Sequence, residues 1–116
     1  MSISDNLKRG TIELMLLTLL KEGDKYGYQL SQTLDERSDG LFTIKETSMY
    51  PTLYRLQSKG LISDYKEKVG VRRTRVYYHL EPNGNAYLEA IRQEYLSLNR
   101  GIFKVLGYPW LEDIEE

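Results

Sequence analysis

The chain has 116 residues, 41% of them hydrophobic, and a formal net charge of -1, which suits one compact domain with an appended element and gives no global attraction to phosphate. It contains no cysteine and a single histidine, which excludes a disulfide framework, a cysteine nucleophile and a thiolate or histidine-rich metal site, so we expect no metal or cofactor. The longest strongly apolar run, Leu14 to Leu20, is much shorter than a bilayer span and no cleavage pattern precedes it, so we expect a cytoplasmic protein without membrane contact.

Two helices are predicted in the first third of the chain. Residues 11–21 are apolar around most of the helix circumference, which indicates a helix buried on several sides at the centre of the fold. After a break, Tyr26, Leu30 and Leu34 recur at the spacing of a second helix. Residues 41–45 lie between two breaks and are too few for a helix, so we expect a short strand there.

A third helix is predicted over residues 47–60, with apolar residues at i, i+4 and i+7 from Met49 on its buried side. Ser48 suits the N-cap, which places Pro51 at the third helical position, where its missing N–H costs no backbone hydrogen bond. The opposite face carries hydroxyl groups, aromatic rings and a guanidinium but no acid. With two residues at its edges included, this face consists of Thr47, Ser48, Tyr50, Pro51, Tyr54, Arg55 and Ser58.

A β-hairpin is predicted from strands over residues 61–68 and 74–80, joined by a loop over residues 69–73. In the second strand, alternate residues from Val76 onward face the helices. The other face carries Arg73, Arg75, Tyr77 and His79. The basic residues of the hairpin are Lys66, Lys68, Arg72, Arg73 and Arg75. The low net charge therefore conceals a basic hairpin, which is balanced in part by the acidic residues 112–116.

Pro82 suits the first position of a long last helix that ends before Gly107. Its apolar residues recur in steps of three and four, as in a heptad seam. The seam consists of Leu88, Ile91, Tyr95, Leu98, Ile102 and Val105. A second copy of the chain is the economical cover for this seam, and packing on its own domain is the alternative. We expect a domain over residues 1–81, a dimerisation helix over 82–106 and an acidic tail over 107–116.

This order of elements is that of a mainly α winged helix-turn-helix fold with a small β-hairpin and a C-terminal dimerisation helix. In this fold a helix enters the DNA major groove and a basic hairpin, the wing, reaches flanking backbone. Hydroxyl and guanidinium groups can donate to phosphates or bases, and apolar groups can contact a thymine methyl. The predicted DNA contacts are Thr47, Ser48, Tyr50, Pro51, Tyr54, Arg55, Arg72, Arg73 and Arg75.

Three stretches of this sequence resemble the PadR family of bacterial transcriptional regulators. They are KRGTIELMLLTLLKEGDKYGYQLSQTL, TSMYPTLYRLQSKGLI and RRTRVYYHLEPNG, and the resemblance runs from about Leu7 to Gly84. It implies a homodimeric repressor that binds a pseudo-palindromic operator in double-stranded DNA and is released by a small, often aromatic effector. Some family members hold planar drugs between tryptophans of the dimer, and the matching position here is Tyr95, which makes Tyr95 the candidate ligand contact.

Other interpretations of the same residues stay open. The basic hairpin could be merely solvated, Tyr50 could be structural, and His79 is expected to be an exposed strand residue. A winged-helix domain can also serve as a protein–protein adaptor without DNA binding. The sequence contains no P-loop, dinucleotide-binding turn or nucleophile elbow, so we expect that it is not an enzyme.

Overall fold

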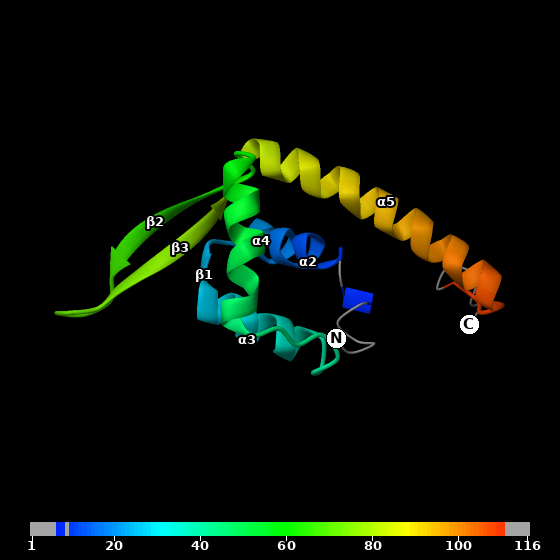
Figure 1. Cartoon of the computed structure of the whole chain (residues 1–116), viewed down its shortest axis with the longest axis horizontal. Coiled ribbons are helices and arrows are strands. Elements are labelled where there is room, and N and C mark those ends of the chain that lie inside the picture. Colours follow the sequence, from blue (N-terminus) through cyan, green and yellow to red (C-terminus); the bar gives the residue numbers. More distant parts are fainter. Residues whose placement is uncertain (1–6, 9, 111–116) are drawn as a thin grey trace.

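The computed structural model describes residues 7–8 and 10–110 (Figure 1). Residues 112–116, the acidic part of the predicted tail, lie outside the described residues. The elements in chain order are α2 (Ile12–Lys21), β1 (Lys25–Tyr26), α3 (Gly27–Arg37), α4 (Glu46–Ser58), β2 (Ile62–Lys68), β3 (Thr74–Leu80) and α5 (Pro82–Leu106). The fold is therefore a winged helix-turn-helix with a long helix after it, as the sequence predicts.

Helix α2 is the centre of the core, which confirms the prediction from its apolar circumference. It packs against α3, α4, α5 and β3. Its buried residues are Leu14, Leu16, Leu17, Leu19 and Leu20. Full burial of one leucine side chain contributes about 1.5–3 kcal/mol relative to exposure, so this one helix provides much of the driving force for folding.

The sheet has three antiparallel strands in the order β1-β3-β2. The predicted hairpin is confirmed, with Ile62 opposite Leu80 at its base and Lys68 opposite Thr74 near its tip. On β3, Tyr78 is buried against the helices, and the edge of this strand pairs with Lys25 and Tyr26 of β1. Figure 1 shows the hairpin reaching out from the helices as a wing.

The short strand predicted at residues 41–45 is wrong, because the third strand is β1. Residues 41–45 form a loop that is fastened by its buried Ile44, whose carbonyl oxygen accepts a hydrogen bond from Ser31 Oγ of α3 at 2.7 Å. Tyr26, predicted within the second helix, instead belongs to β1 and caps α3 with extended backbone. Two residues in β1 are enough because β3 supplies their hydrogen-bond partners.

The predicted start of the third helix is also wrong. Helix α4 begins at Glu46 with Lys45 as N-cap, so Pro51 lies within the helix rather than in its first turn. Proline has no N–H to donate to the carbonyl of Thr47, four residues earlier. Thr47 is exposed, so water can satisfy that carbonyl and the helix continues through Pro51.

Helix α5 starts at Pro82, as predicted, and its first turn lies close to Leu61, in the connection between α4 and β2. The N–H of Glu81 donates to the carbonyl oxygen of Leu61 at 3.0 Å. A Cβ on Gly84 would lie 2.0 Å from the same oxygen, so only glycine allows this approach. The contact fixes where α5 leaves the core.

The predicted seam of α5 has two different environments. Leu88 is 2% exposed and belongs to the core of its own chain, so its assignment to a partner contact is wrong. Ile91 and Tyr95 are partly buried against the same core. The remaining seam residues lie on the part of α5 that extends away from the domain (Figure 1). They are exposed: Leu98 at 66%, Ile102 at 46% and Val105 at 88%. No helix within residues 7–8 and 10–110 is both long and apolar enough to cross a membrane.

Candidate nucleic-acid interface

The first half of α4 presents a polar, exposed face. Thr47, Ser48, Pro51 and Tyr54 are all exposed, with Tyr54 at 60%. This orientation follows from the opposite stripe of Met49, Leu53 and Leu56, which are each 0% exposed. Four of the predicted contact residues on α4 are therefore accessible together.

Tyr50 has a different position, because it is half-buried at the edge of this face. Its hydroxyl donates to Glu46 Oε2 at 2.6 Å, and its ring stacks on Tyr54 with centroids 6.2 Å apart. The hydrogen bond to Glu46, assisted by burial, raises the pKa of Tyr50 to about 12. A Cβ on Gly27 would lie 2.9 Å from the Tyr50 hydroxyl oxygen, so Gly27 makes room for this arrangement. Tyr50 is thus both a structural contact and a support for Tyr54.

Arg55 turns away from the exposed face and toward α2. Its Nε donates to Glu13 Oε1 at 3.3 Å, and its Nη2 lies 3.5 Å from Thr52 Oγ1. The sequence did not reveal this pairing, because Glu13 lies 42 residues earlier in the chain. Arg55 is therefore already engaged within the chain.

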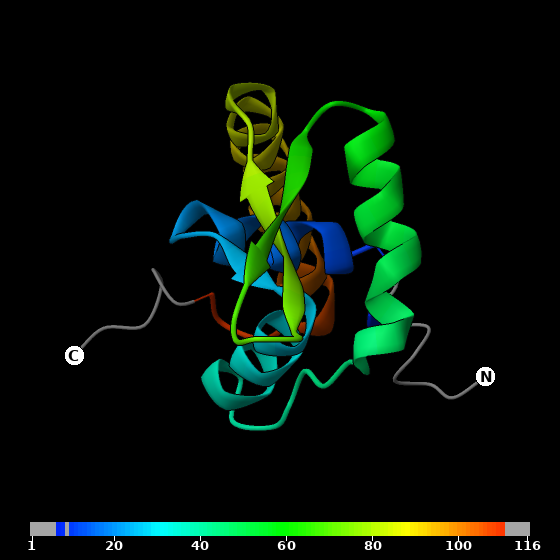
Figure 2. The ribbon, with the colours of Figure 1, turned by 90° about the vertical axis from the view of Figure 1, so that its left-hand side faces the viewer.

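The tip of the wing carries the exposed arginines. Arg72 and Arg73 lie in the loop between β2 and β3, which is closed by a hydrogen bond from the N–H of Val69 to the carbonyl oxygen of Arg73 at 3.0 Å. Within the described chain, no acidic side chain forms an ion pair with either guanidinium. Figure 2, viewed toward the wing, shows the hairpin beside α4. Both predicted DNA-binding elements therefore lie on one side of the molecule.

Arg75 differs from the two tip arginines because it is half-buried on β3, next to Thr74 and opposite Glu67 of β2. Its guanidinium carbon lies 4.2 Å from the ring centroid of Tyr26, a cation–π contact. Tyr26 meets Tyr77 edge-on at 5.5 Å, and Tyr77 stacks on Tyr65 at 5.6 Å. This row of rings stiffens the middle of the wing and holds Arg75 in place.

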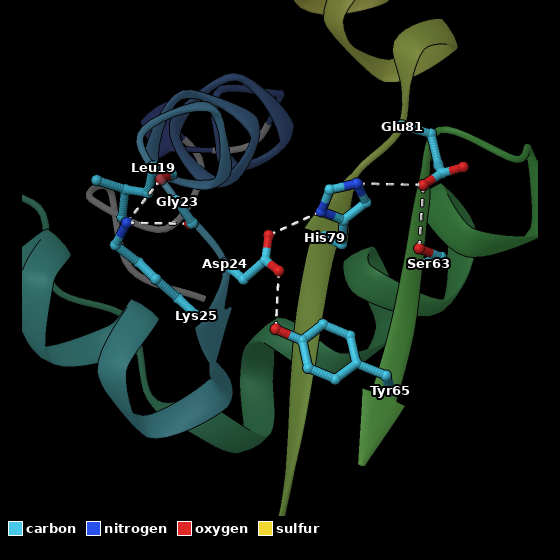
Figure 3. A network of polar contacts seen from close by, with 8 residues as sticks. All are labelled: Leu19, Gly23, Asp24, Lys25, Ser63, Tyr65, His79 and Glu81. Atoms are coloured by element: carbon cyan, nitrogen blue, oxygen red, sulfur yellow. Dashed lines mark hydrogen bonds and ion pairs between the residues drawn. The ribbon is translucent and has the colours of Figure 1, made fainter. Parts of the chain in front are cut away.

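Sequence reasoning missed a polar network on the outer face of the sheet (Figure 3). The Asp24 carboxylate, just before β1, accepts hydrogen bonds from Tyr65 at 2.7 Å and from His79 Nδ1 at 2.8 Å. His79 Nε2 lies 3.5 Å from Glu81 Oε2, which also accepts from Ser63 Oγ at 3.2 Å. His79 is exposed, as predicted, but it connects the wing to the loop after α2 and to the N-cap of α5. Sequence spacing gave no signal for this network because its members meet through the strand register.

These contacts shift three pKa values. Burial works against the charge of Asp24, but hydrogen bonds from His79 and Tyr65 outweigh it and lower the pKa of Asp24. The hydrogen bond to Asp24 raises the pKa of His79. The same carboxylate raises the pKa of Tyr65 to about 12. Protonated His79 therefore binds the network more tightly than neutral His79.

A central helix, a third helix with an exposed first half and a two-stranded basic wing together define a winged helix-turn-helix protein. No group of three or more metal-binding side chains occurs in the described part of the chain.

Comparisons with known proteins give the same class and a family. The model of the transcriptional regulator PadR-like family matches residues 16–90. The structure of a transcriptional regulator from Clostridium thermocellum is similar with a TM-score of 0.78 and 35% identity, over 89% of this chain and 97% of that chain. An uncharacterized protein of Lysinibacillus sphaericus is 33% identical over 93 residues, which is 80% of this chain and 85% of that protein.

Bacillus subtilis PadR, crystallised in complex with operator DNA, shares the fold at a TM-score of 0.65 and 23% identity, over 71% of this chain and 46% of that chain. The chain belongs to the PadR-like family of transcriptional regulators, which confirms the resemblance in its sequence. Members of this family are transcriptional regulators rather than enzymes.

The Asp24–His79 contact predicts a pH-dependent contribution to stability. Because the pKa of His79 is raised in the folded chain, this contribution is complete below the ordinary histidine value of 6.5 and is lost as the pH rises through the raised value. The difference in free energy of unfolding between the unchanged protein and His79→Gln should therefore shrink between pH ~6 and pH ~9. Tyr65→Phe is the control. Its difference in free energy of unfolding from the unchanged protein should stay constant over this range, since the pKa of Tyr65 is raised to about 12. A His79→Gln difference that stays constant with pH would contradict the assignment.

Proposed function

We propose that this protein is a homodimeric transcriptional repressor of the cytoplasm that binds an operator in double-stranded DNA through α4 and the wing. The observation that carries the proposal is that α4, with its exposed first half, lies next to strand β2 of the wing whose tip carries the exposed residues Arg72 and Arg73 (Figure 2). An α-helix fits the major groove, and a cationic hairpin next to it can reach the phosphates on its flank. The DNA complex of Bacillus subtilis PadR supports the proposal by its shared fold.

The two elements divide the work of recognition. Thr47 and Ser48 offer hydroxyl groups for base edges or phosphates, while Pro51 and Tyr54 offer apolar surface for thymine methyl groups. Arg72 and Arg73 neutralise backbone charge, which raises affinity for any sequence. Specificity therefore depends on α4, and the salt dependence of binding depends mainly on the wing.

A second copy of the chain covers the exposed seam residues of α5 in this proposal. Leu98, Ile102 and Val105 recur on one face of a helix segment that is not covered by its own domain. A two-fold pairing through this face presents two copies of α4 to half-sites about one helical turn of DNA apart, roughly 34 Å, so the operator is pseudo-palindromic.

The effector site of this proposal is a cavity of about 570 Å³ between α2, the loop before α4 and α5. Its lining includes the apolar or aromatic residues Leu7, Met15, Leu41, Phe42 and Tyr95. Such a lining suits a planar aromatic molecule. A compound bound there touches both the DNA-binding domain and α5, so it can shift one against the other and release DNA.

Removal of the tip arginines tests the wing. Arg72→Ala with Arg73→Ala should leave folding and dimerisation intact. It should lower affinity by roughly tenfold both for a duplex from upstream of the protein's own gene and for a scrambled duplex. The slope of log affinity against log salt concentration should fall by about two. Fluorescence anisotropy at several salt concentrations measures both. Arg92→Ala with Lys104→Ala, which removes the same charge from α5, is the control. Equal losses in both variants would remove the wing from the mechanism.

Charge placed on the exposed seam tests the dimer. Leu98→Asp with Ile102→Asp should give folded monomers that lose preference for the upstream duplex, because the two half-sites are no longer bound together. Analytical ultracentrifugation measures the oligomeric state. Gln93→Asp with Lys104→Asp changes two exposed residues on the opposite face and should leave a dimer. A dimeric Leu98→Asp, Ile102→Asp variant would show that another surface pairs.

Loss of the Tyr95 ring tests the effector site. In a screen of planar aromatic compounds, some should release the unchanged protein from the upstream duplex, and Tyr95→Ala should weaken that release by about tenfold or more while binding DNA without the compound. Tyr108→Ala, which removes an exposed ring outside the cavity, should respond as the unchanged protein does. An unchanged response of Tyr95→Ala would place the effector elsewhere.

A further inference from the structure

Glu13 of α2 joins the helix proposed for DNA recognition to the helix proposed for dimerisation. Its side chain is only 17% exposed, and each carboxylate oxygen has one partner from a different element. Oε1 accepts from Nε of Arg55 on α4 at 3.3 Å, and Oε2 accepts from the hydroxyl of Tyr87 on α5 at 2.8 Å. One carboxylate therefore binds α4 and α5 at once.

The surroundings of Tyr87 strengthen this connection. The Nζ of Lys59, at the C-cap of α4, lies 5.8 Å from the centroid of the Tyr87 ring. The hydrogen bond to Glu13 raises the pKa of Tyr87, so its hydroxyl remains a donor throughout the neutral range. The side chain of Arg55 is 52% exposed and accessible to water, yet it forms an ion pair with Glu13. The second half of α4 is thus held from both the α2 side and the α5 side.

We propose that Glu13 is a positioning residue for DNA recognition, and that Arg55 acts through Glu13 by fixing α4 relative to α5 rather than by contacting DNA. This inference rests on the proposed binding of DNA by α4 and on the pairing of α5. In a dimer paired through α5, the distance and angle between the two copies of α4 depend on how each α4 is set against its own α5. A contact between these helices therefore governs whether both half-sites are bound together.

This role differs from a phosphate contact in a measurable way. Loss of a phosphate contact weakens specific and random binding alike and lowers the slope of log affinity against log salt by about one. Loss of helix positioning weakens binding to the two half-sites, whereas binding to random DNA and the salt slope stay as they were. Residues that act as one unit also show effects that do not add.

The test compares Glu13→Gln, Arg55→Gln, the double variant and Tyr87→Phe with the unchanged protein. The upstream duplex and the scrambled duplex are titrated by anisotropy over a salt series. We expect Glu13→Gln and Arg55→Gln each to lower affinity for the upstream duplex by about three- to tenfold, with salt slopes unchanged. The double variant should bind this duplex no more weakly than the single variant with the lower affinity. Tyr87→Phe should give a loss of the same kind but smaller.

Glu22→Gln is the matched control, because Glu22 also pairs with an arginine, Arg37 of α3, but does not join α4 to α5. It should bind both duplexes as the unchanged protein does. Thermal unfolding of every variant verifies that the chain is folded at the assay temperature, and Tyr87→Phe, which loses one hydroxyl, provides the least disruptive probe.

Two results would overturn the inference. A Glu13→Gln variant with unchanged affinity, together with an Arg55→Gln variant whose salt slope falls by about one, would make Arg55 a phosphate contact. Failure of the unchanged protein to bind either duplex would overturn the proposed function along with the inference. Binding of the upstream duplex by the unchanged protein distinguishes the two failures, because it is retained when only the inference fails.

Discussion

The burial of α2 is the constraint on which the rest of the structure depends. Leu16 and Leu17 are 0% exposed because other elements surround this helix on every apolar side. Helices α3, α4 and α5 and strand β3 all pack against it. The same packing turns the stripe of α4 inward, and its polar face is outward as a consequence. The candidate DNA surface is thus a by-product of how one leucine-rich helix is covered.

The two halves of α5 have different surroundings. Its first half, with Leu88, completes the core, and Gly84 allows its first turn to lie against the carbonyl of Leu61. Its second half exposes Leu98 and Val105. In the proposed dimer, a helix that is anchored at one end and paired at the other transmits the geometry of the pairing to the domain. Glu13 accepts hydrogen bonds from both α4 and α5, so it connects the proposed dimerisation helix to the helix proposed for DNA recognition.

Much of the fold could be predicted from local sequence. The apolar circumference of α2, the stripe of α4 and the alternation of the wing are periodic signals, and all three correspond to elements of the structure. The predictions are wrong where a residue far away in the sequence determines strand pairing or burial. Residues 41–45 have the composition of a strand, but β3 pairs with β1 instead. Leu88 has heptad spacing, but its own core covers it.

The candidate site was predictable to a similar extent. Exposure of Thr47, Pro51 and Tyr54 follows from helical periodicity. The surroundings of Arg55 and Arg75 do not, because Glu13 and Tyr26 reach them only through tertiary packing and strand pairing. Residue type indicates what a guanidinium can do, and only the fold shows which partner it has.

The most direct test of the central claim is the binding of the unchanged protein to a duplex from upstream of its own gene and to a scrambled duplex, at several salt concentrations. Recognition by α4 and the wing predicts a clear preference for the upstream duplex and an affinity that falls steeply as salt rises. Equal and weak binding of both duplexes, even at low salt, would contradict this account and favour a winged-helix adaptor that binds another protein.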